Sequence, residues 1–140
     1  SIAHKIGAEY HIPHGRTNAI LLPHVIRYNG TFPTKPATWP KYNYYKADER
    51  YQTLAKMLGL PASTVEEGVE SFAKACYDLG VQIGIKMNFA EQGLDETIYM
   101  NNLEKLGLLA FEDQCTPCNP KLPLVTDMMD IMKKAFYPQN

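Results

Sequence analysis

Hydrophobic positions after residue 45 recur every three or four residues, the spacing that places side chains on one face of an α-helix. Alternation with period two never runs long enough to make a convincing strand. The pattern therefore predicts an all-α chain. Four helices are expected after residue 45, over residues 46–58 and 63–80, from about Asp95, and from about Thr126 to Pro138.

The same spacing predicts which side chains of each helix face inward. We expect Tyr51, Leu54, Ala55 and Leu58 in the first helix, Val65, Val69, Phe72, Ala73 and Cys76 in the second, Ile98, Leu103 and Leu106 in the third, and Met128, Met132, Ala135 and Phe136 in the fourth. Ser63, with Glu66 three residues later, is a capping-box pattern at the start of the second helix.

Two proline-rich segments interrupt the helical pattern. Residues 29–45 contain three prolines, Trp39 and several tyrosines, which predicts a loop held against the helices by its aromatic side chains. Residues 114–123 contain three more prolines, which predicts an extended turn. The first segment is too aromatic to be a free linker.

Length and charge narrow the function classes. A chain of 140 residues with 45% hydrophobic residues fits one globular domain, and 14 basic against 15 acidic side chains give a net charge of −1. That balance disfavours nucleic acid as a partner. The longest aliphatic run, residues 19–22, is too short to span a membrane, and three cysteines suit a reducing compartment. We therefore expect a cytoplasmic protein without a membrane or nucleic-acid partner.

All four histidines fall within the first 24 residues, which suggests either a metal site or a route for protons. The alternatives are a tag, although a tag would be consecutive, or ordinary surface histidines. His14, between Pro13 and Gly15, is expected to project from a rigid helix start, with His4 facing the same pocket from the preceding helix. His11 either joins them or points to solvent, and His24 is expected at the surface or in the core.

Three other features of the sequence point to local structure and not to a catalytic site. Pro23 predicts a kink near residues 19–22 of the helix that begins at His14. Cys115 and Cys118 form a CxxC motif, but no second cysteine pair and no βαβ unit accompany it, so a zinc or thioredoxin-like role is disfavoured. Thr126 and Asp127 are best explained as capping residues of the last helix.

Several longer motifs resemble the iron-dependent alcohol dehydrogenases. They are His4-Lys5-Ile6-Gly7-Ala8, Ile12-Pro13-His14-Gly15, Leu21-Leu22-Pro23-His24-Val25, Arg27-Tyr28-Asn29 and Phe111-Glu112-Asp113-Gln114-Cys115-Thr116. The segment from Thr31 to Tyr51 is more narrowly similar to the alcohol dehydrogenase half of the bifunctional aldehyde-alcohol dehydrogenases. The resemblance spans nearly the whole chain.

The resemblance implies an architecture and a set of site residues. Residues 1–140 would be the helical, metal-side C-terminal domain, and the nucleotide-binding domain would lie upstream. His14 matches the last histidine ligand of the iron, and the ligand before it would fall one residue before Ser1. His4 matches a histidine that relays protons, Cys115 a position at the substrate pocket, and His11 is expected on the cofactor side of the cleft.

Two residues depart from that family's pattern. Cys118 stands where relatives usually carry a small residue, which puts a thiol near the pocket, although packing is its simpler role. Arg16 adds a positive charge close to His14, and we expect its side chain to point to solvent.

The function implied by the resemblance is NADH-linked interconversion of acetaldehyde and ethanol. The complete enzyme would use Fe(II) and NAD, its partners would be a small alcohol or aldehyde and the missing nucleotide-binding domain, and a homo-oligomer or filament is a candidate assembly. The 140-residue chain alone is expected to bind neither cofactor and to be inactive. The alternative hypothesis is a free-standing helical interaction module whose histidines are structural.

Overall fold

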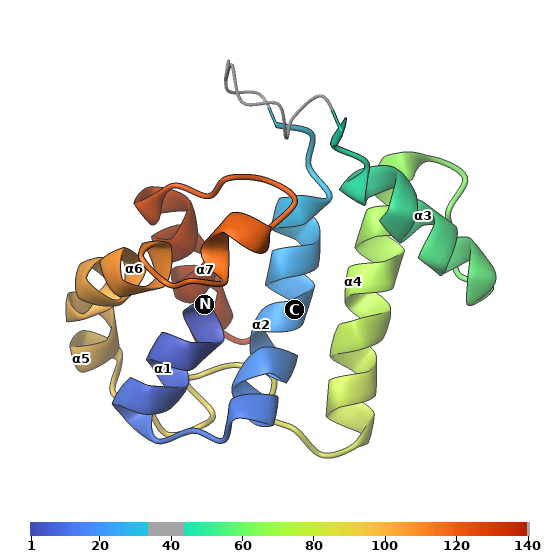
Figure 1. The fold of residues 1–140 in the computed structure, drawn as a ribbon. Helices are drawn as coiled ribbons and strands as arrows, with labels where there is room; N and C mark the ends of the chain where they lie inside the picture. The colour runs from blue at the N-terminus through green and yellow to red at the C-terminus, as the bar shows by residue number, and fades with distance from the viewer. Residues whose placement is uncertain (34–43, 140) are drawn as a thin grey trace.

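Helix α2 (His14–Asn29) is the central element of the fold, with α1, α4 and α7 packed against it (Figure 1). The computed structural model describes residues 1–33 and 44–139, and in these ranges every regular element is a helix, which confirms the all-α prediction. The other helices are α1 (Ile2–Tyr10), α3 (Ala47–Met57), α4 (Val65–Gln82), α5 (Glu96–Asn101), α6 (Leu103–Phe111), the short 3₁₀ helix η2 (Thr116–Cys118) and α7 (Val125–Phe136). None of the described helices is both long and apolar enough to span a membrane.

The larger hydrophobic cluster, hereafter the main core, lies among α1, α2, α5, α6 and α7. Tyr99 is fully buried at its centre, with its ring centroid 4.9 Å from that of Phe136 and 5.7 Å from that of Phe89. The Tyr99 hydroxyl donates a hydrogen bond to the Met132 carbonyl at 2.9 Å. Burying each such side chain contributes about 1.5–3 kcal/mol, so this cluster holds α1 and α6 in place.

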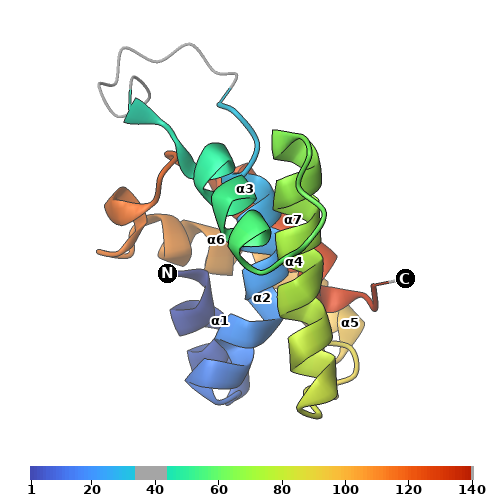
Figure 2. The ribbon, with the colours of Figure 1, turned by 90° about the vertical axis from the view of Figure 1, so that its right-hand side faces the viewer.

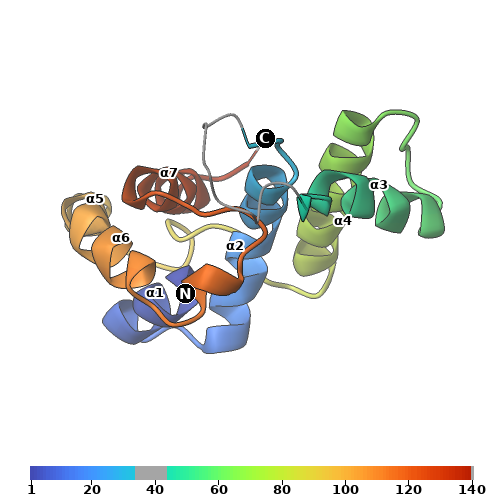
Figure 3. The ribbon, with the colours of Figure 1, turned by 45° about the horizontal axis from the view of Figure 1, so that its top comes forward.

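A smaller cluster joins α4 to α2 and is built on Ile26, Val69 and Ala73. Helix α3 crosses α4 on the side away from the main core (Figure 3). Gly68 allows this crossing, since a Cβ there would lie 2.7 Å from the Cα of Gln52. Arg27 and Glu70 add a two-pronged ion pair between α2 and α4, with both N···O distances 2.8 Å.

Helices occur where they were predicted, but the third is divided at Asn102 into α5 and α6. Three of the expected inward residues are also wrong. Leu54 and Leu58 are 40% and 62% exposed, and Ile98 is 57% exposed. Periodicity identifies a helix face, but these positions lie on the edges of their faces, where no neighbouring element of the described chain covers them. The expected residues of the last helix, Met128, Met132, Ala135 and Phe136, are all buried.

The start of α4 also differs by one residue from the prediction. The N-cap is Thr64, whose hydroxyl accepts the Glu67 N–H, and the Ser63 N–H and hydroxyl both donate to the Glu67 carboxylate. The capping interaction therefore uses Glu67 and not Glu66. The box forms one residue later because Thr64, with extended backbone angles, is the last residue before helical geometry begins.

The two proline-rich segments differ in how far the structure describes them. Most of residues 29–45 lies outside the described residues, but Tyr45 donates a hydrogen bond to the Asn29 carbonyl and packs edge-on against Phe32. Residues 114–123 contain no α-helix, as predicted, but they include the compact 3₁₀ helix η2, which the predicted extended turn did not anticipate. Helix α2 continues through Pro23 without interruption, so the kink expected there stays a prediction.

Candidate functional site

A tight turn between α1 and α2 places two histidines side by side. His11 closes α1 in the left-handed backbone region, with φ of 56°, and Pro13 precedes the first residue of α2. The Thr17 hydroxyl donates to the Pro13 carbonyl at 3.1 Å, which fixes the turn. As a result the rings of His4 and His14 stack with centroids 5.2 Å apart and an angle of 21° between their planes.

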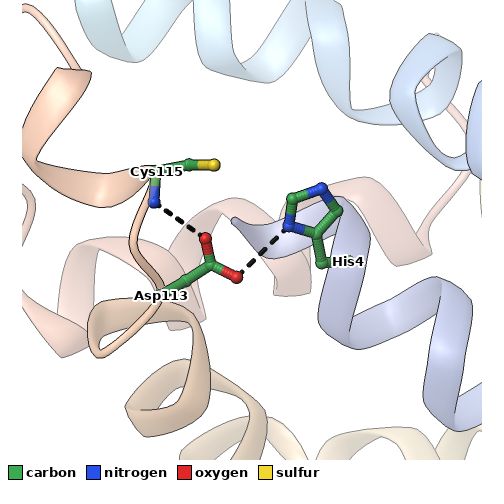
Figure 4. A group of neighbouring side chains, drawn as sticks. All are labelled: His4, Asp113 and Cys115. Atoms are coloured by element: carbon green, nitrogen blue, oxygen red, sulfur yellow. Dashed lines mark hydrogen bonds and ion pairs between the residues drawn. The ribbon is translucent and has the colours of Figure 1, made fainter.

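Asp113 joins this histidine pair from the loop that follows α6 (Figure 4). One oxygen of its carboxylate lies 3.2 Å from Nδ1 of His4 and 3.0 Å from Nζ of Lys5. The other accepts the backbone N–H of Cys115 at 2.9 Å. Figure 1 shows that α1 and the loop after α6 lie side by side, although 109 positions of sequence separate His4 from Asp113.

The surroundings of Asp113 keep it ionised. The N–H of Cys115, then Lys5 and then His4 donate to its carboxylate and hold its pKa well below the usual range. The Asp113 side chain is only 7% exposed, while that of His4 is 45% exposed. Asp113 thus presents a fixed negative charge to an imidazole that remains open to solvent on its other side.

His4, Asp113 and Cys115 form a group of potential metal donors. One donor atom from each of these three residues lies within 4.8 Å of the other two. However, the ammonium of Lys5 already lies 3.0 Å from the Asp113 carboxylate, in the position where a cation would neutralise that charge. The group is therefore better described as an Asp–His–Lys ion-pair network than as a metal centre.

The loop carrying Asp113 and Cys115 is held by polar contacts to α2, to α6 and to Thr31, which follows α2. Asn29 and Asn119 exchange side-chain amide hydrogen bonds at 3.0 and 2.8 Å. The buried hydroxyl of Thr116 donates to the Ala110 carbonyl at 2.6 Å. Lys121 donates to the Thr31 carbonyl at 2.9 Å with its Nζ 4.0 Å above the Tyr28 ring. These contacts fix the loop relative to the histidines, as a precise site requires.

A cavity of about 610 Å³ lies between α1, α2 and this loop. Its wall is mostly apolar, and the polar groups on it come from Ser1, from α2 and from residues 115–119 of the loop. The lining residues include Gly15 and Asn18 of α2, Cys115 and Cys118 of the loop, and Met128 of α7. The volume falls in the range of pockets that take small organic molecules.

The structure brings together three of the four predicted site residues. His4 and His14 stack, and Cys115 lies next to His4, at the cavity wall. His11 is exposed in the turn. None of these three histidines is among the described residues that line the cavity, although Ala3 and Gly15, the neighbours of His4 and His14 in the sequence, are. Arg16 is exposed, as expected from the sequence, and its guanidinium donates to the side-chain oxygen of Gln92 at 3.5 Å.

His24 lies apart from this site and is explained by packing. It is 7% exposed and one of its ring nitrogens lies 2.7 Å from the side-chain amide of Gln139. Burial lowers its pKa to about 4, and the nearby charges of Arg27 and Lys134 act in the same direction. Of the two expected locations for His24, the surface or the core, the structure confirms the core.

Sequence reasoning missed the roles of Asp113, Lys5 and Asn18. Asn18 is one turn after His14 on α2, and its side-chain amide lies 2.9 Å from Nε2 of His14. That spacing of four residues was a usable signal. Nothing local could have paired Lys5 with Asp113, because the contact depends on how α1 packs against α6.

Comparison with known proteins places the chain in a family. The family model described as Fe-containing alcohol dehydrogenase family, C-terminal, matches residues 1–136. The chain belongs to the Fe-containing alcohol dehydrogenase family. The match covers the histidines, Asp113 and the cavity, so the site described above lies wholly within the matched residues.

Individual relatives point in the same direction. The chain is 66% identical over 137 residues to the aldehyde-alcohol dehydrogenase of Streptococcus pneumoniae serotype 4, and 55% identical over 138 residues to aldehyde-alcohol dehydrogenase 2 of Entamoeba histolytica. It is 37% identical over 143 residues to the bifunctional aldehyde-alcohol dehydrogenase of Escherichia coli K12. These matches cover 98% or more of the chain but 16% of each relative's length.

A solved structure shares the fold. The chain superimposes on the crystal structure of a 1,3-propanediol oxidoreductase with a TM-score of 0.76 and 24% sequence identity, covering 96% of this chain and 31% of that one. At this identity the likeness supports the arrangement of helices alone. It agrees with the all-α domain predicted from the sequence.

Proposed function

We propose that this chain is the metal-side helical domain of an iron-dependent alcohol dehydrogenase that interconverts an aldehyde and an alcohol with NADH. The observation that carries the proposal is the stacked His4–His14 pair, with Asp113 bonded to His4, next to a cavity for a small molecule. The names of the aldehyde-alcohol dehydrogenase relatives support an aldehyde and an alcohol as the substrate pair, and acetaldehyde and ethanol are the pair proposed. The family match supports this proposal over a free-standing interaction module.

His14 is the residue proposed to hold the metal. It is exposed at the start of α2, and its imidazole is a donor that suits Fe(II) and other divalent ions. A single imidazole is too weak a site for the ion, so we propose that further ligands and the nucleotide-binding domain come from the remaining length of the protein. The 140 residues alone are then expected to bind neither iron nor NAD. When bound, the iron supplies Lewis acidity toward the substrate oxygen and NADH supplies the hydride.

His4 is proposed to move the proton that accompanies hydride transfer. Because Asp113 is ionised, it favours the His4 tautomer in which Nδ1 carries the hydrogen and donates to the carboxylate. The other ring nitrogen, Nε2, is then free to accept or return a proton. Asp113 acts through His4 and is therefore a positioning residue.

The remaining predicted residues complete the proposal. Cys115 contributes to the wall of the substrate cavity, and the apolar residues around it exclude water from the reacting oxygen. His11, exposed in the turn before α2, is proposed to face the cofactor in the complete enzyme. A homo-oligomer or filament and a cytoplasmic location stay predictions from the sequence.

The test uses the complete protein and compares His14→Ala with Arg16→Gln. The His14 variant is expected to lose bound iron, measured by elemental analysis, together with ethanol oxidation. Arg16 is exposed two residues away and has no assigned role, so Arg16→Gln is expected to keep both. Wild-type iron content in the His14 variant would remove the proposed ligand and the function built on it.

The role of Asp113 is separated from that of His14 by kinetics. Asp113→Asn keeps an acceptor for the Cys115 N–H but loses the charge that favours the donating tautomer of His4. We expect kcat to fall by about 10- to 100-fold, with bound iron retained and the pH profile of kcat displaced. A rise in KM alone, with kcat and its pH profile unchanged, would show that Asp113 does not act through His4.

A further inference from the structure

Cys115 and Cys118 stand at the two ends of one 3₁₀ turn. The Cys118 N–H donates to the Cys115 carbonyl at 3.1 Å, which closes the turn. Residues three apart in a 3₁₀ helix point to the same side, and with a rise of about 2.0 Å per residue their Cα atoms are about 6 Å apart. Disulfides bridge Cα atoms that are about 4.4–6.8 Å apart. The backbone therefore already has a spacing that a disulfide requires.

Both thiols are also accessible. Cys115 and Cys118 are free and exposed, and both line the 610 Å³ cavity. The third cysteine, Cys76, is half-buried in the small cluster of α4, where burial raises the pKa of its thiol. A soluble oxidant can therefore reach the exposed thiols of Cys115 and Cys118 on the same turn, whereas the thiol of Cys76 is partly shielded.

The turn between the two thiols is rigid. Pro117 has a fixed φ, and the Thr116 side chain is buried and bonded to the Ala110 carbonyl at 2.6 Å. The residue after Cys118, Asn119, donates a hydrogen bond from its side-chain amide to the side chain of Asn29 on α2. Because the backbone is held in this way, the two sulfurs meet at little cost in chain entropy.

We propose that Cys115 and Cys118 are a modification site at which a hydroperoxide forms a reversible intramolecular disulfide. This proposal rests on the geometry of the turn and is independent of the proposed function. The disulfide would join two residues of the cavity wall, so oxidation would change the shape and the thiol content of that wall.

The chemistry balances in two steps. One thiolate attacks an oxygen of the hydroperoxide, which breaks the O–O bond, forms a sulfenic acid and releases water or an alcohol. The second thiol attacks the sulfenic sulfur, the S–S bond forms, the S–O bond breaks and water leaves. The two sulfurs lose two electrons in total, and the hydroperoxide gains them.

The experiment maps the thiols of the protein after brief exposure to hydrogen peroxide. Free thiols are alkylated, and trypsin then releases residues 106–121 with both Cys115 and Cys118, and residues 75–86 with Cys76. The first peptide is expected to be unalkylated and two hydrogens lighter, and the second to be alkylated. Treatment with dithiothreitol before alkylation is expected to restore two alkyl groups to the first peptide.

Variants separate this result from general oxidation. Cys118→Ser and Cys115→Ser are expected to form no internal disulfide and to give a sulfenic acid that dimedone traps, whereas Cys76→Ser behaves as the parent. Circular dichroism of each variant shows that the helices are kept. Two alkylated thiols after peroxide, conversion of either cysteine to sulfinic acid in the parent, or disulfides only between chains would each overturn the proposal.

Discussion

The two sides of α2 differ in how firmly they are packed, and the candidate site lies on the firmer one. Among residues 1–33 and 44–139, the main core has sixteen buried residues, against three in the cluster that joins α4 to α2. Figure 2 shows α3 and α4 in front of α2, and Figure 1 shows that they lie on the side of α2 that faces away from α5. The α3–α4 pair is therefore joined to α2 through few fully buried hydrophobic side chains, together with the Arg27–Glu70 ion pair.

This difference explains where the chemistry is located. His4 comes from α1, and Asp113 and Cys115 follow α6, so both parts of the site are carried by helices of the main core. Positions fixed by a large core vary least, which a hydrogen bond from His4 to Asp113 needs. The α3–α4 pair can loosen without moving these residues.

The strongest test removes the centre of the main core. Tyr99→Ala is expected to lower the free energy of unfolding by about 3–5 kcal/mol, because it leaves a cavity among Phe89 and Phe136. Urea unfolding measures the loss. Tyr99→Phe is the matched control and should lose only about 0.5–1.5 kcal/mol with the hydrogen bond to Met132. Similar values for the two variants would mean that the ring does not organise this core.

A second test measures how stability depends on pH through His24, which lies on α2 close to Lys134 of α7. Burial lowers the pKa of His24 from 6.5 to about 4, with Arg27 and Lys134 contributing. Between pH 4 and pH 6.5, His24 therefore carries a proton in the unfolded chain but not in the folded chain. Stability is intact above pH 6.5 and falls by up to about 3 kcal/mol as the pH drops through 4.

The His24 contribution is isolated by comparing His24→Gln with the parent. The variant removes the titrating group, so its unfolding free energy should depend less steeply on pH between 6.5 and 4. Urea unfolding at several pH values in this window gives both slopes. Equal slopes in the two proteins would show that His24 is not the group responsible.

A third test acts on the α3–α4 side alone. A Cβ at Gly68 would lie 2.7 Å from the Cα of Gln52, so Gly68→Ala is expected to cost about 1–3 kcal/mol and to push α3 away from α4. Gly15→Ala, also on a helix, has no atom within 4 Å of its new Cβ and should be neutral or slightly stabilising.

Hydrogen exchange shows where the Gly68 variant loosens. Amides of α3 should lose protection, while those of α1 and α6 keep theirs. Loss of protection in α1 or α6 would contradict the separation between the two sides of α2.

The smallest effect concerns the start of α4. Thr64→Ala removes the acceptor for the Glu67 N–H and should lower the free energy of unfolding by about 1 kcal/mol. Thr64→Ser keeps a hydroxyl and should retain most of the stability. If Ser63→Ala proved more damaging than Thr64→Ala in thermal unfolding, the cap would lie at the position first predicted from the sequence.

Local sequence determined the elements of this protein. Hydrophobic spacing is enough to predict helices, and Pro13 is enough to start α2 at His14, because both effects act over a few neighbouring residues. The cluster of histidines likewise predicted that the functional site lies near residues 1–24. These features could be read without knowledge of the fold.

The tertiary structure decided which of these residues meet and which side chains are covered. Asp113 holds His4 across 109 positions, and Leu54, Leu58 and Ile98 are exposed although their spacing matched that of buried residues. The physical reason is that periodicity describes a single helix. The partner that covers a face, or approaches a histidine, comes from elsewhere in the chain and is fixed only when the helices pack together.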